Sequence, residues 1–230
     1  MLWIVVSTIT VSLISIYAGH SRLLHIDQVT LRRLSISLLL VLFVFLILQW
    51  MHRIGLFPEA AAGFTMANVY ASLFGFFFGA AIQQFNQKKE AGKILYVNRS
   101  FWTDILPNVI VLGVILFGIQ RTSILSDLPF TPIRITSGLS IIAVGLYGLT
   151  IRLVPEFRDK GLILLDRMIS WEDFMAYSWY SEGVIEIEYK HNGSIKSFKT
   201  MVPEEDELFL EKTLSKKIAE KLENDEFEEV

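Results

Sequence analysis

Residues 60–85 read AAAGFTMANVYASLFGFFFGAAIQQF, and this stretch decides the fold of the chain. It is predominantly apolar and longer than the ~20 residues that a helix needs to cross a bilayer. Five small residues recur in it at every fourth position: Gly63, Ala67, Ala71, Gly75 and Gly79. Four residues of an α-helix turn about 400°, so these positions form one slowly drifting stripe. Small residues let a second helix approach closely, and we predict that this stripe is a helix-packing interface.

Two different helices could pack against this stripe. One is another helix of the same chain. The other is a helix of a different membrane protein or of a second copy of this chain. Two helices that cross at an angle stay in contact for only a few turns. A stripe of five small residues, each four positions after the last, is longer than the contact region of one such crossing. We therefore expect a partner in the membrane besides the surrounding lipids.

The composition indicates a membrane protein and narrows its chemistry. The chain has 230 residues, of which 52% are hydrophobic, and its mean hydropathy is +0.46. It contains no cysteine, which excludes disulfides, zinc-thiolate sites and thiol catalysis. The net charge of -3 and the absence of a basic stripe give no sign of nucleic-acid binding. Most of the acidic residues follow residue 154, so the two parts of the chain differ in character.

Five stretches approach the length of a membrane span: Leu2–Ala18, Leu34–Met51, Ala60–Phe85, Phe101–Gln120 and Pro132–Val154. The connectors between them alternate between many and few basic residues. The first connector holds Arg22, Arg32 and Arg33, and the third holds Lys88, Lys89, Lys93 and Arg99. Basic connectors favour the cytoplasmic side. This pattern predicts a multi-pass protein of the bacterial inner membrane, with its N-terminus outside and its C-terminus in the cytoplasm.

The segment after Pro155 reads as a soluble domain, so we divide the chain into a transmembrane domain, 1–154, and a cytoplasmic domain, 155–230. Gly161–Leu165 has the pattern of a short buried strand, which turns at Asp166-Arg167 and returns over Met168–Trp171. The following Ser170–Asp173 fits either a helical turn with a capping box or the end of a strand.

The end of the chain predicts a hairpin and a helix. Val184–Lys190 alternates apolar and charged residues, and Asn192-Gly193 is a strong hairpin signal. The turn pairs this strand with Ser194–Met201 and sets Ile187 opposite Phe198. After Pro203, four acidic residues begin an amphipathic helix with the apolar stripe Leu210, Leu214, Ile218 and Leu222. We read the last residues, 223–230, as an acidic tail. The predicted fold is an α-helical membrane bundle of five spans followed by a small α+β domain, an antiparallel sheet plus one C-terminal helix.

Two resemblances extend this interpretation. Gly161-Leu-Ile-Leu164, Ile169-Ser-Trp171 and Tyr177-Ser-Trp179, followed by a hairpin and a helix, resemble the small domains of uncharacterised bacterial membrane proteins. Those domains are similar to a minimal pleckstrin-homology-like (PH-like) sheet, so the resemblance implies a PH-like fold and no activity.

The membrane helices resemble a second family. Leu73–Gly79, Leu112-Gly113 and the run from Arg134 to Tyr147 look like the trailing helices of bacterial lipid-phosphate phosphatases of the PAP2 type. That family's catalytic signature includes a Pro-Ser-Gly-His run, which this sequence lacks. The resemblance therefore implies similar helix packing without the family's catalysis.

Candidate binding residues fall into three groups. Lys88, Lys89, Lys93 and Arg99 beside a span fit contacts to lipid headgroups, although basic residues there also serve as the ordinary topology signal. Trp171, Tyr177, Trp179 and Tyr180 fit either the core of the small domain or a docking surface. Asp104 and Arg134 are ionisable residues about one turn inside predicted spans, where such groups mark ion or substrate paths.

The pattern of residues favours a non-catalytic role. No arrangement of nucleophile and base is visible, and the histidines are not spaced as metal or haem ligands, so we predict neither an enzyme nor a bound cofactor. We expect an integral membrane accessory, scaffold or regulatory subunit of a larger membrane complex. The alternative is a small transporter or lipid-handling membrane protein, which would use Asp104 and Arg134.

Overall fold

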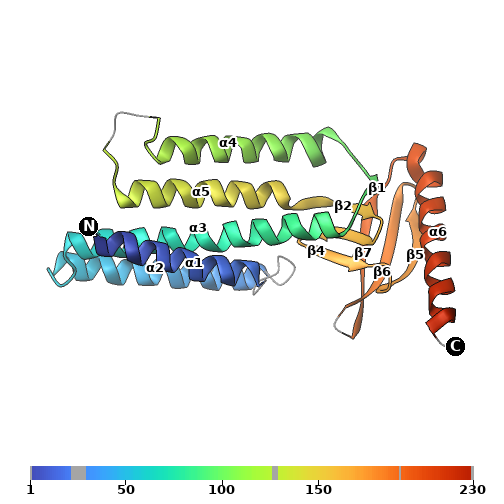
Figure 1. The fold of residues 1–230 in the computed structure, drawn as a ribbon, viewed down its shortest axis with the longest axis horizontal. Coiled ribbons are helices and arrows are strands. Elements are labelled where there is room, and N and C mark those ends of the chain that lie inside the picture. The colour runs from blue at the N-terminus through green and yellow to red at the C-terminus, as the bar shows by residue number, and fades with distance from the viewer. Residues whose placement is uncertain (1, 22–29, 126–128, 192, 229–230) are drawn as a thin grey trace. The chain divides into compact units, whose positions relative to one another are not determined.

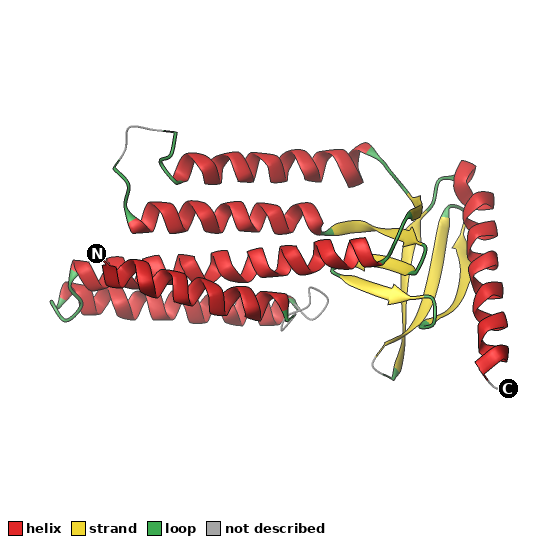
Figure 2. Ribbon diagram, viewed as in Figure 1, coloured by secondary structure: helices red, strands yellow, loops and turns green. Residues whose placement is uncertain are grey.

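The computed structural model describes residues 2–21, 30–125, 129–191 and 193–228. The chain forms two compact units. The helical unit comprises Met1–Phe85 and Leu106–Thr150, and the sheet-plus-helix unit comprises Asn86–Ile105 and Ile151–Val230. The chain therefore passes between the units three times. Figure 1 labels the elements, and Figure 2 shows that the strands all belong to the sheet-plus-helix unit.

Within the described residues, five helices are long and apolar enough to cross a membrane, and the fourth runs from Phe101 to Arg121. They are α1 (Leu2–His20), α2 (Leu31–Arg53), α3 (Glu59–Glu90), α4 (Leu106–Arg121), which is preceded by the π-helical turn η2 (Phe101–Ile105), and α5 (Pro132–Thr150). The five spans expected from the sequence are thus present as helices. Arg22, which contributed to the predicted orientation, lies outside the described residues.

Helices α1 and α3 pack closely through small residues. A Cβ on Gly75 would overlap the carbonyl oxygen of Ser12, and a Cβ on Gly79 would overlap that of Ile16. Serines of α1 add hydrogen bonds at this interface: Ser7 Oγ donates to Asn68 Oδ1 at 2.7 Å, and Ser15 Oγ donates to Ser72 Oγ at 3.1 Å. Contacts advance along both helices in the same direction, so α1 and α3 run parallel.

Helices α4 and α5 pack in the opposite sense. Gly118 lies against Ile142, and Gly148 lies against Val111, so the two helices are antiparallel. Tyr147 of α5 in turn contacts Phe77 of α3, with ring centroids 5.8 Å apart. Glycines again mark the points of close approach, as expected where lipid removes the hydrophobic drive between helices.

In its described residues, the sheet-plus-helix unit holds two antiparallel sheets and one C-terminal helix, together with the end of α3 and the turn η2. The first sheet has the order β1 (Ile94–Val97), β2 (Arg152–Arg158), β3 (Gly161–Leu165), β4 (Arg167–Ser170). The second has the order β5 (Phe174–Ser181), β6 (Val184–His191), β7 (Ser194–Met201). Helix α6 (Glu204–Glu228) follows the last strand.

A single apolar core lies between these sheets and α6. Phe157, Ile185, Ile187, Leu210 and Leu214 are all at most 1% exposed. The predicted β6–β7 hairpin is present, and Ile187 pairs with Phe198 as expected. Its turn residue Asn192 lies outside the described residues.

The structure corrects the junction after the fifth span. We expected that helix to continue to Val154, but α5 ends at Thr150 and β2 begins at Arg152. Pro155 explains the change, because the residue before a proline is driven away from helical backbone angles. The register of β2 against β3 shifts between Arg152 and Glu156, which is where a sheet accommodates proline.

The third connector is also more ordered than expected. Residues 86–100 looked like a basic loop, but Ile94–Val97 forms β1, which pairs with β2. The sequence placed this segment in the transmembrane domain, 1–154, whereas the structure places 86–105 with residues 151–230. Four residues of mixed character are too few to show the period-2 pattern of a strand.

Two smaller expectations at the C-terminal side are also decided. Ser170 ends β4 and residues 171–173 form a turn, in which the Asp173 backbone N–H donates to Ser170 Oγ at 3.3 Å, so the strand-end alternative is confirmed and the helical turn is not. The helix α6 extends to Glu228, through most of the segment read as an acidic tail. Leu222 lies on this helix but is 58% exposed, so the buried stripe ends before it.

Candidate functional site

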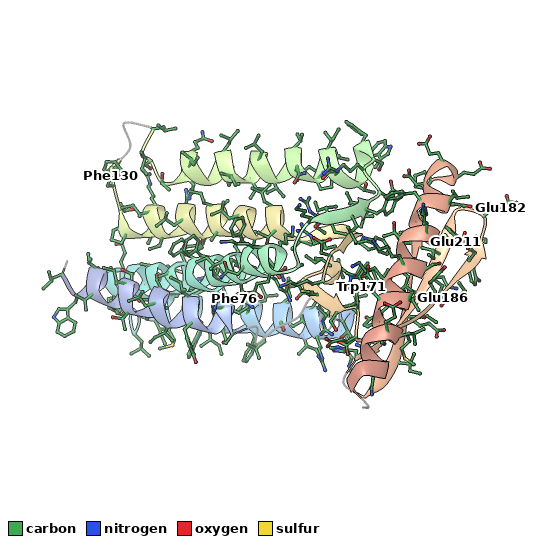
Figure 3. The ribbon with its side chains drawn as sticks, turned by 45° about the vertical axis from the view of Figure 1, so that its right-hand side comes forward. Phe76, Phe130, Trp171, Glu182, Glu186 and Glu211 are labelled. Carbon is green, nitrogen blue, oxygen red and sulfur yellow. The ribbon has the colours of Figure 1, made fainter. Side chains whose placement is uncertain are left out.

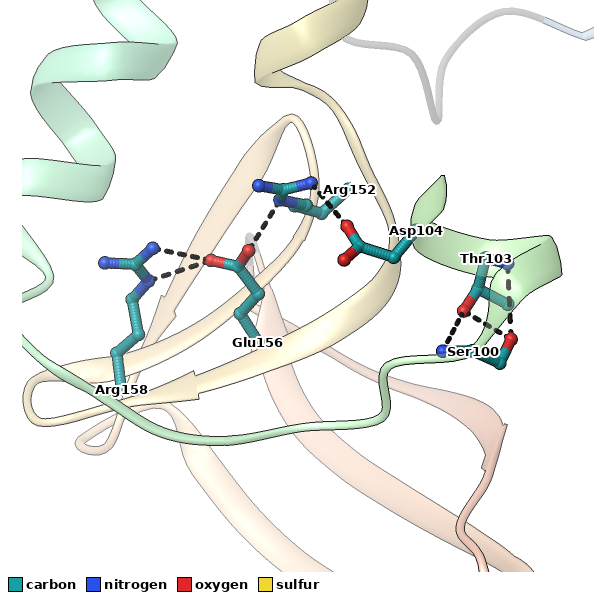
Figure 4. A network of polar contacts seen from close by, with 6 residues as sticks. All are labelled: Ser100, Thr103, Asp104, Arg152, Glu156 and Arg158. Carbon is teal, nitrogen blue, oxygen red and sulfur yellow. Dashed lines mark hydrogen bonds and ion pairs between the residues drawn. The ribbon is translucent and has the colours of Figure 1, made fainter. Parts of the chain in front are cut away.

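A buried carboxylate in β2 is the centre of a polar cluster (Figure 4). The side chain of Glu156 is only 3% exposed and lies between two arginines. Arg158 Nη2 lies 2.6 Å from Glu156 Oε2, and Arg152 Nε lies 2.6 Å from Glu156 Oε1. Glu156 and Arg158 are two residues apart on β2 and so share one face of the strand, whereas the β2 register against β3 shifts between Arg152 and Glu156.

Arg158 continues the cluster to the end of α3. Its Nη1 donates to the carbonyl oxygens of Lys88 at 2.9 Å and Gly92 at 2.8 Å. The last carbonyls of a helix have no partner within the helix and carry partial negative charge. Arg158 therefore caps α3 while it also pairs with Glu156.

Arg152 extends the cluster towards the start of α4. Its Nη1 lies 3.4 Å from Asp104 Oδ1, and Asp104 belongs to the π-helical turn η2. Reciprocal hydrogen bonds of 3.3 Å between Ser100 and Thr103, backbone N–H to side-chain oxygen, hold the beginning of this turn. We refer to Asp104, Arg152, Glu156 and Arg158 together as the ion-pair chain.

The ion-pair chain reaches each place where the polypeptide passes between the two units. Its contacts lie at the end of α3 (Lys88), just before α4 (Asp104) and just after α5 (Arg152). The passages themselves are at 85–86, 105–106 and 150–151. One continuous set of polar contacts, entirely inside the sheet-plus-helix unit, therefore joins three segments that each continue into a different apolar helix.

The charges in this cluster favour the ionised carboxylate. Burial alone would raise the pKa of Glu156, but the hydrogen bonds from Arg158 and the positive charges of Lys88 and Arg152 outweigh it and lower that pKa. Glu156 therefore stays charged at neutral pH although it is buried, which is what a structural ion pair requires.

Strand β1 is held at a second point by α6. Tyr96 is buried, its ring contacts Phe157, and its hydroxyl donates to Asp206 Oδ2 at 3.1 Å. Burial, followed by the effect of Asp206, raises the pKa of the Tyr96 hydroxyl, so this group stays protonated. The strand from the α3–α4 connector is thus an integral part of the unit's core.

The small-residue stripe lies largely against helices of the same chain. Ala67 and Ala71 are buried, and Gly75 and Gly79 lie against α1. A Cβ added at Gly63 would lie 3.9 Å from Cδ1 of Ile133 in α5. The length of the stripe had suggested a partner helix. The described contacts of these positions are with α1 and α5, and the partner helix stays a prediction.

The predicted lysine cluster does not form one site. Lys89 and Lys93 are exposed, whereas Lys88 is half-buried beside the ion-pair chain. Arg99 lies beyond the other end of β1, since the whole of Ile94–Val97 separates it from Lys93. Of the four residues, Lys88 alone has a charge that acts on Glu156.

The predicted aromatic group lies mostly in the core (Figure 3 labels Trp171). Trp171, Tyr177 and Trp179 pack against the buried cluster, and Trp171 Nε1 donates to the carbonyl oxygen of Asp159 at 3.0 Å. Tyr180 is 64% exposed, with the Lys199 ammonium 3.1 Å from its ring centre. Tyr180 is thus the most exposed of the four aromatic residues, and the other three are half-buried.

The two ionisable residues predicted inside spans are not brought together. Asp104 pairs with Arg152, whereas Arg134 lies near the far end of α4, where Arg121 Nε donates to Ser137 Oγ at 3.3 Å. Arg134 itself donates to the Pro129 carbonyl oxygen at 3.4 Å. The full length of α4 separates Asp104 from Arg134, so these two residues do not form a shared path.

Sequence reasoning missed the arginines and the glutamate of β2. Arg152, Glu156 and Arg158 surround Pro155, at the junction that we read as a helix end. The alternation of charged residues at 152, 156 and 158 was visible, but it gains meaning only with β1 and the end of α3 beside it. Within the described residues, no group of three or more His, Asp or Glu side chains is placed to hold a metal ion.

Comparison with known proteins finds one match, which covers part of the chain. Residues 153–219 match a family model described as a domain of unknown function, DUF5673. No curated protein and no solved structure matches the chain. The match runs from β2 into α6 and leaves out β1, so the structure adds a strand to the matched region. The resemblance to PAP2-type phosphatases gains no support from these comparisons.

Proposed function

We propose that this protein is a non-catalytic integral membrane accessory, scaffold or regulatory subunit of a larger complex in a bacterial inner membrane. In this proposal the sheet-plus-helix unit is a PH-like domain in the cytoplasm that binds a partner protein. When the partner binds this domain, the ion-pair chain changes the stability of the membrane helices that it connects. The observation that carries the proposal is that this one chain of contacts reaches all three passages between the units.

The directions of the helices support five membrane crossings. The parallel α1 and α3 need one crossing between them, which α2 supplies, and the antiparallel α4 and α5 are consecutive crossings. Strands β1 and β2 share a sheet and must lie on the same side of the membrane. Two crossings, α4 and α5, lie between these strands, which satisfies that condition. The basic connector at residues 86–100 favours the cytoplasm for that side.

The arrangement of strands supports a PH-like fold. Four strands form one antiparallel sheet, three form a second, and a single C-terminal helix closes the core with Leu210 and Leu214. This is the sheet-plus-helix arrangement that the resemblance implied. Sheet edges and loops of such a unit are surfaces that can bind a peptide or protein segment.

The decisive experiment is extraction of the tagged full-length protein in mild detergent, followed by mass measurement and identification of what co-purifies. We expect a stoichiometric second membrane protein. A matched sample carrying Glu156→Gln should retain the same partner but transmit less change to the helices, measured by hydrogen exchange in α3 and α5. A clean monomer or homodimer in the native extract would contradict the subunit proposal.

A further inference from the structure

Two arginines meet at one end of the α4–α5 hairpin, within the helical unit. Arg121 is the last residue of α4, and Arg134 lies in the first turn of α5. One hydroxyl contacts both residues: Ser137 Oγ accepts a hydrogen bond from Arg121 Nε at 3.3 Å and donates to the backbone oxygen of Arg134 at 3.1 Å. Ser137 is only 3% exposed, so it holds Arg121 against α5 from a fixed position. We refer to Arg121 and Arg134 as the arginine pair.

The arginine pair carries positive charge with no carboxylate beside it. Among the described residues, neither guanidinium forms an ion pair. The groups that accept their hydrogen bonds are neutral: Ser137 Oγ and, at 3.4 Å from Arg134 Nη1, the Pro129 carbonyl oxygen. A guanidinium has more N–H donors than these bonds use. Arg134 is half-buried, and a charge partly removed from water is costly unless an opposite charge accompanies it.

The surroundings of the arginine pair indicate where that opposite charge comes from. Arg121 ends one helix that is long enough to cross a membrane and Arg134 begins the next, so both lie at the depth of lipid headgroups. Three apolar side chains of the connector, Ile124, Leu125 and Phe130, are each at least 64% exposed (Figure 3 labels Phe130). Exposed apolar side chains next to a membrane span are suited to contact with acyl chains.

The usual reason for basic residues beside a span does not apply to this end of the hairpin. Basic residues concentrate in cytoplasmic connectors, and residues 86–100 form the basic connector that we place in the cytoplasm. Helix α4 makes one crossing between that connector and Arg121. The arginine pair therefore lies on the opposite side, where membrane orientation does not explain two arginines.

We propose that the arginine pair binds the phosphate group of an anionic phospholipid, whose acyl chains lie against Ile124, Leu125 and Phe130. Guanidinium groups recognise phosphate through paired hydrogen bonds, and the Ser137 hydroxyl orients one of the two groups. The exposed apolar residues favour a lipid over free phosphate, which would make no contact with them. This inference goes beyond the proposed subunit role and does not depend on it, because a protein that purifies alone would carry the same site.

The test is native mass spectrometry of the full-length protein in neutral detergent, titrated with phosphatidylglycerol and, as a control, with uncharged phosphatidylcholine. We expect Arg134→Gln and Arg121→Gln each to weaken phosphatidylglycerol retention about tenfold, as loss of one charge-assisted hydrogen bond predicts. Arg121 is exposed, so Arg121→Gln should fold normally. The matched control is Arg53→Gln, because Arg53 is an exposed arginine that also ends a span. It should change retention by less than about twofold.

A further variant, Ser137→Ala, tests the geometry of the site rather than its charge. It keeps both arginines and removes the hydroxyl that holds Arg121. We expect about fivefold weaker retention of phosphatidylglycerol, as loss of one neutral hydrogen bond predicts. A general attraction between lipid and positive charge would leave retention unchanged, and that result would overturn the proposal.

Three other outcomes would also overturn it. Equal losses in Arg53→Gln and Arg134→Gln would mean that any arginine at the end of a span attracts the lipid. Displacement of phosphatidylglycerol by millimolar inorganic phosphate would mean that the apolar residues contribute nothing to the site. Asp127 of the connector lies outside the described residues. A tenfold gain in retention by Asp127→Asn would mean that this carboxylate, and not a lipid, neutralises the arginine pair.

Discussion

The two units of this protein are packed by different residues. Buried positions in the helical unit are mainly alanine, glycine and serine, such as Ala67, Gly75 and Ser140. Buried positions in the sheet-plus-helix unit are large and apolar, such as Phe157, Ile187 and Leu214. Large apolar side chains on α2, by contrast, are exposed along the whole helix.

The difference follows from the two solvents. Water drives large apolar groups together, at roughly 25 cal/mol per Å² buried, so the sheet-plus-helix unit is built around them. Lipid gives no such drive, and helices in it associate by close backbone contact and short polar bonds. The same side chain, leucine, is therefore a core residue at position 214 and a lipid-facing residue on α2.

The strongest test of this comparison is to place a large side chain in the small-residue interface. Gly79→Leu should separate α1 from α3, because even a Cβ there would overlap the Ile16 carbonyl. The readout is a disulfide between Ser15→Cys and Ser72→Cys, whose hydroxyls lie 3.1 Å apart in a chain without native cysteine. We expect this cross-link to be lost. Gly113→Leu is the matched control, since nothing lies within 4 Å of its added Cβ. Full cross-linking in Gly79→Leu would show that the helices are not packed through the stripe.

A smaller effect is expected when a large buried side chain of the sheet-plus-helix unit is shortened. Leu214→Ala should lower the free energy of unfolding by about 2–5 kcal/mol, because a fully buried leucine leaves a cavity. Leu208→Ala, on the same helix but 80% exposed, should change it by less than ~0.5 kcal/mol. Urea unfolding followed by tryptophan fluorescence measures both. Similar losses from the two substitutions would mean that α6 does not bury the face described.

The smallest effect is expected when a charge is removed from the ion-pair chain, whose central carboxylate is both buried and ionised. The pKa of Glu156 is below its ordinary value of 4.5, so its stabilisation is complete above that pH and is lost as the pH falls through the folded-state pKa. Glu156→Gln should lower stability at pH 7 by about 1–3 kcal/mol and flatten the dependence below pH 4.5. Thermal unfolding from pH 7 to 3 compares the two proteins, and parallel curves would exclude Glu156 as the group responsible.

Much of the fold was predictable because it depends on local patterns. The five apolar stretches, the β6–β7 register and the start of α6 each carry their signal within a few turns or a single hairpin. The end of α5 was misplaced because Leu153 and Val154 continue an apolar run, and hydropathy does not distinguish a span from a buried strand. Pro155 was the residue that should have ended the helix earlier.

The candidate site was not predictable for a different reason. Its members, at 88, 104, 152, 156 and 158, meet only because β1 pairs with β2 across two intervening helices. In the sequence, each of these charged residues resembles an ordinary residue at the membrane interface or one that sets the membrane orientation. Long-range pairing of this kind leaves no trace in local periodicity.

The insertion of β1 between α3 and α4 has a consequence for how the protein is made. The ribosome releases β1 before α4 and α5, and its neighbour β2 emerges only after both. If one of these helices failed to enter the bilayer, β1 and β2 would be delivered to opposite faces and the sheet would stay open. An open sheet exposes an unpaired strand edge, which proteases and chaperones recognise. Pairing of β1 with β2 therefore requires that α4 and α5 cross the bilayer together.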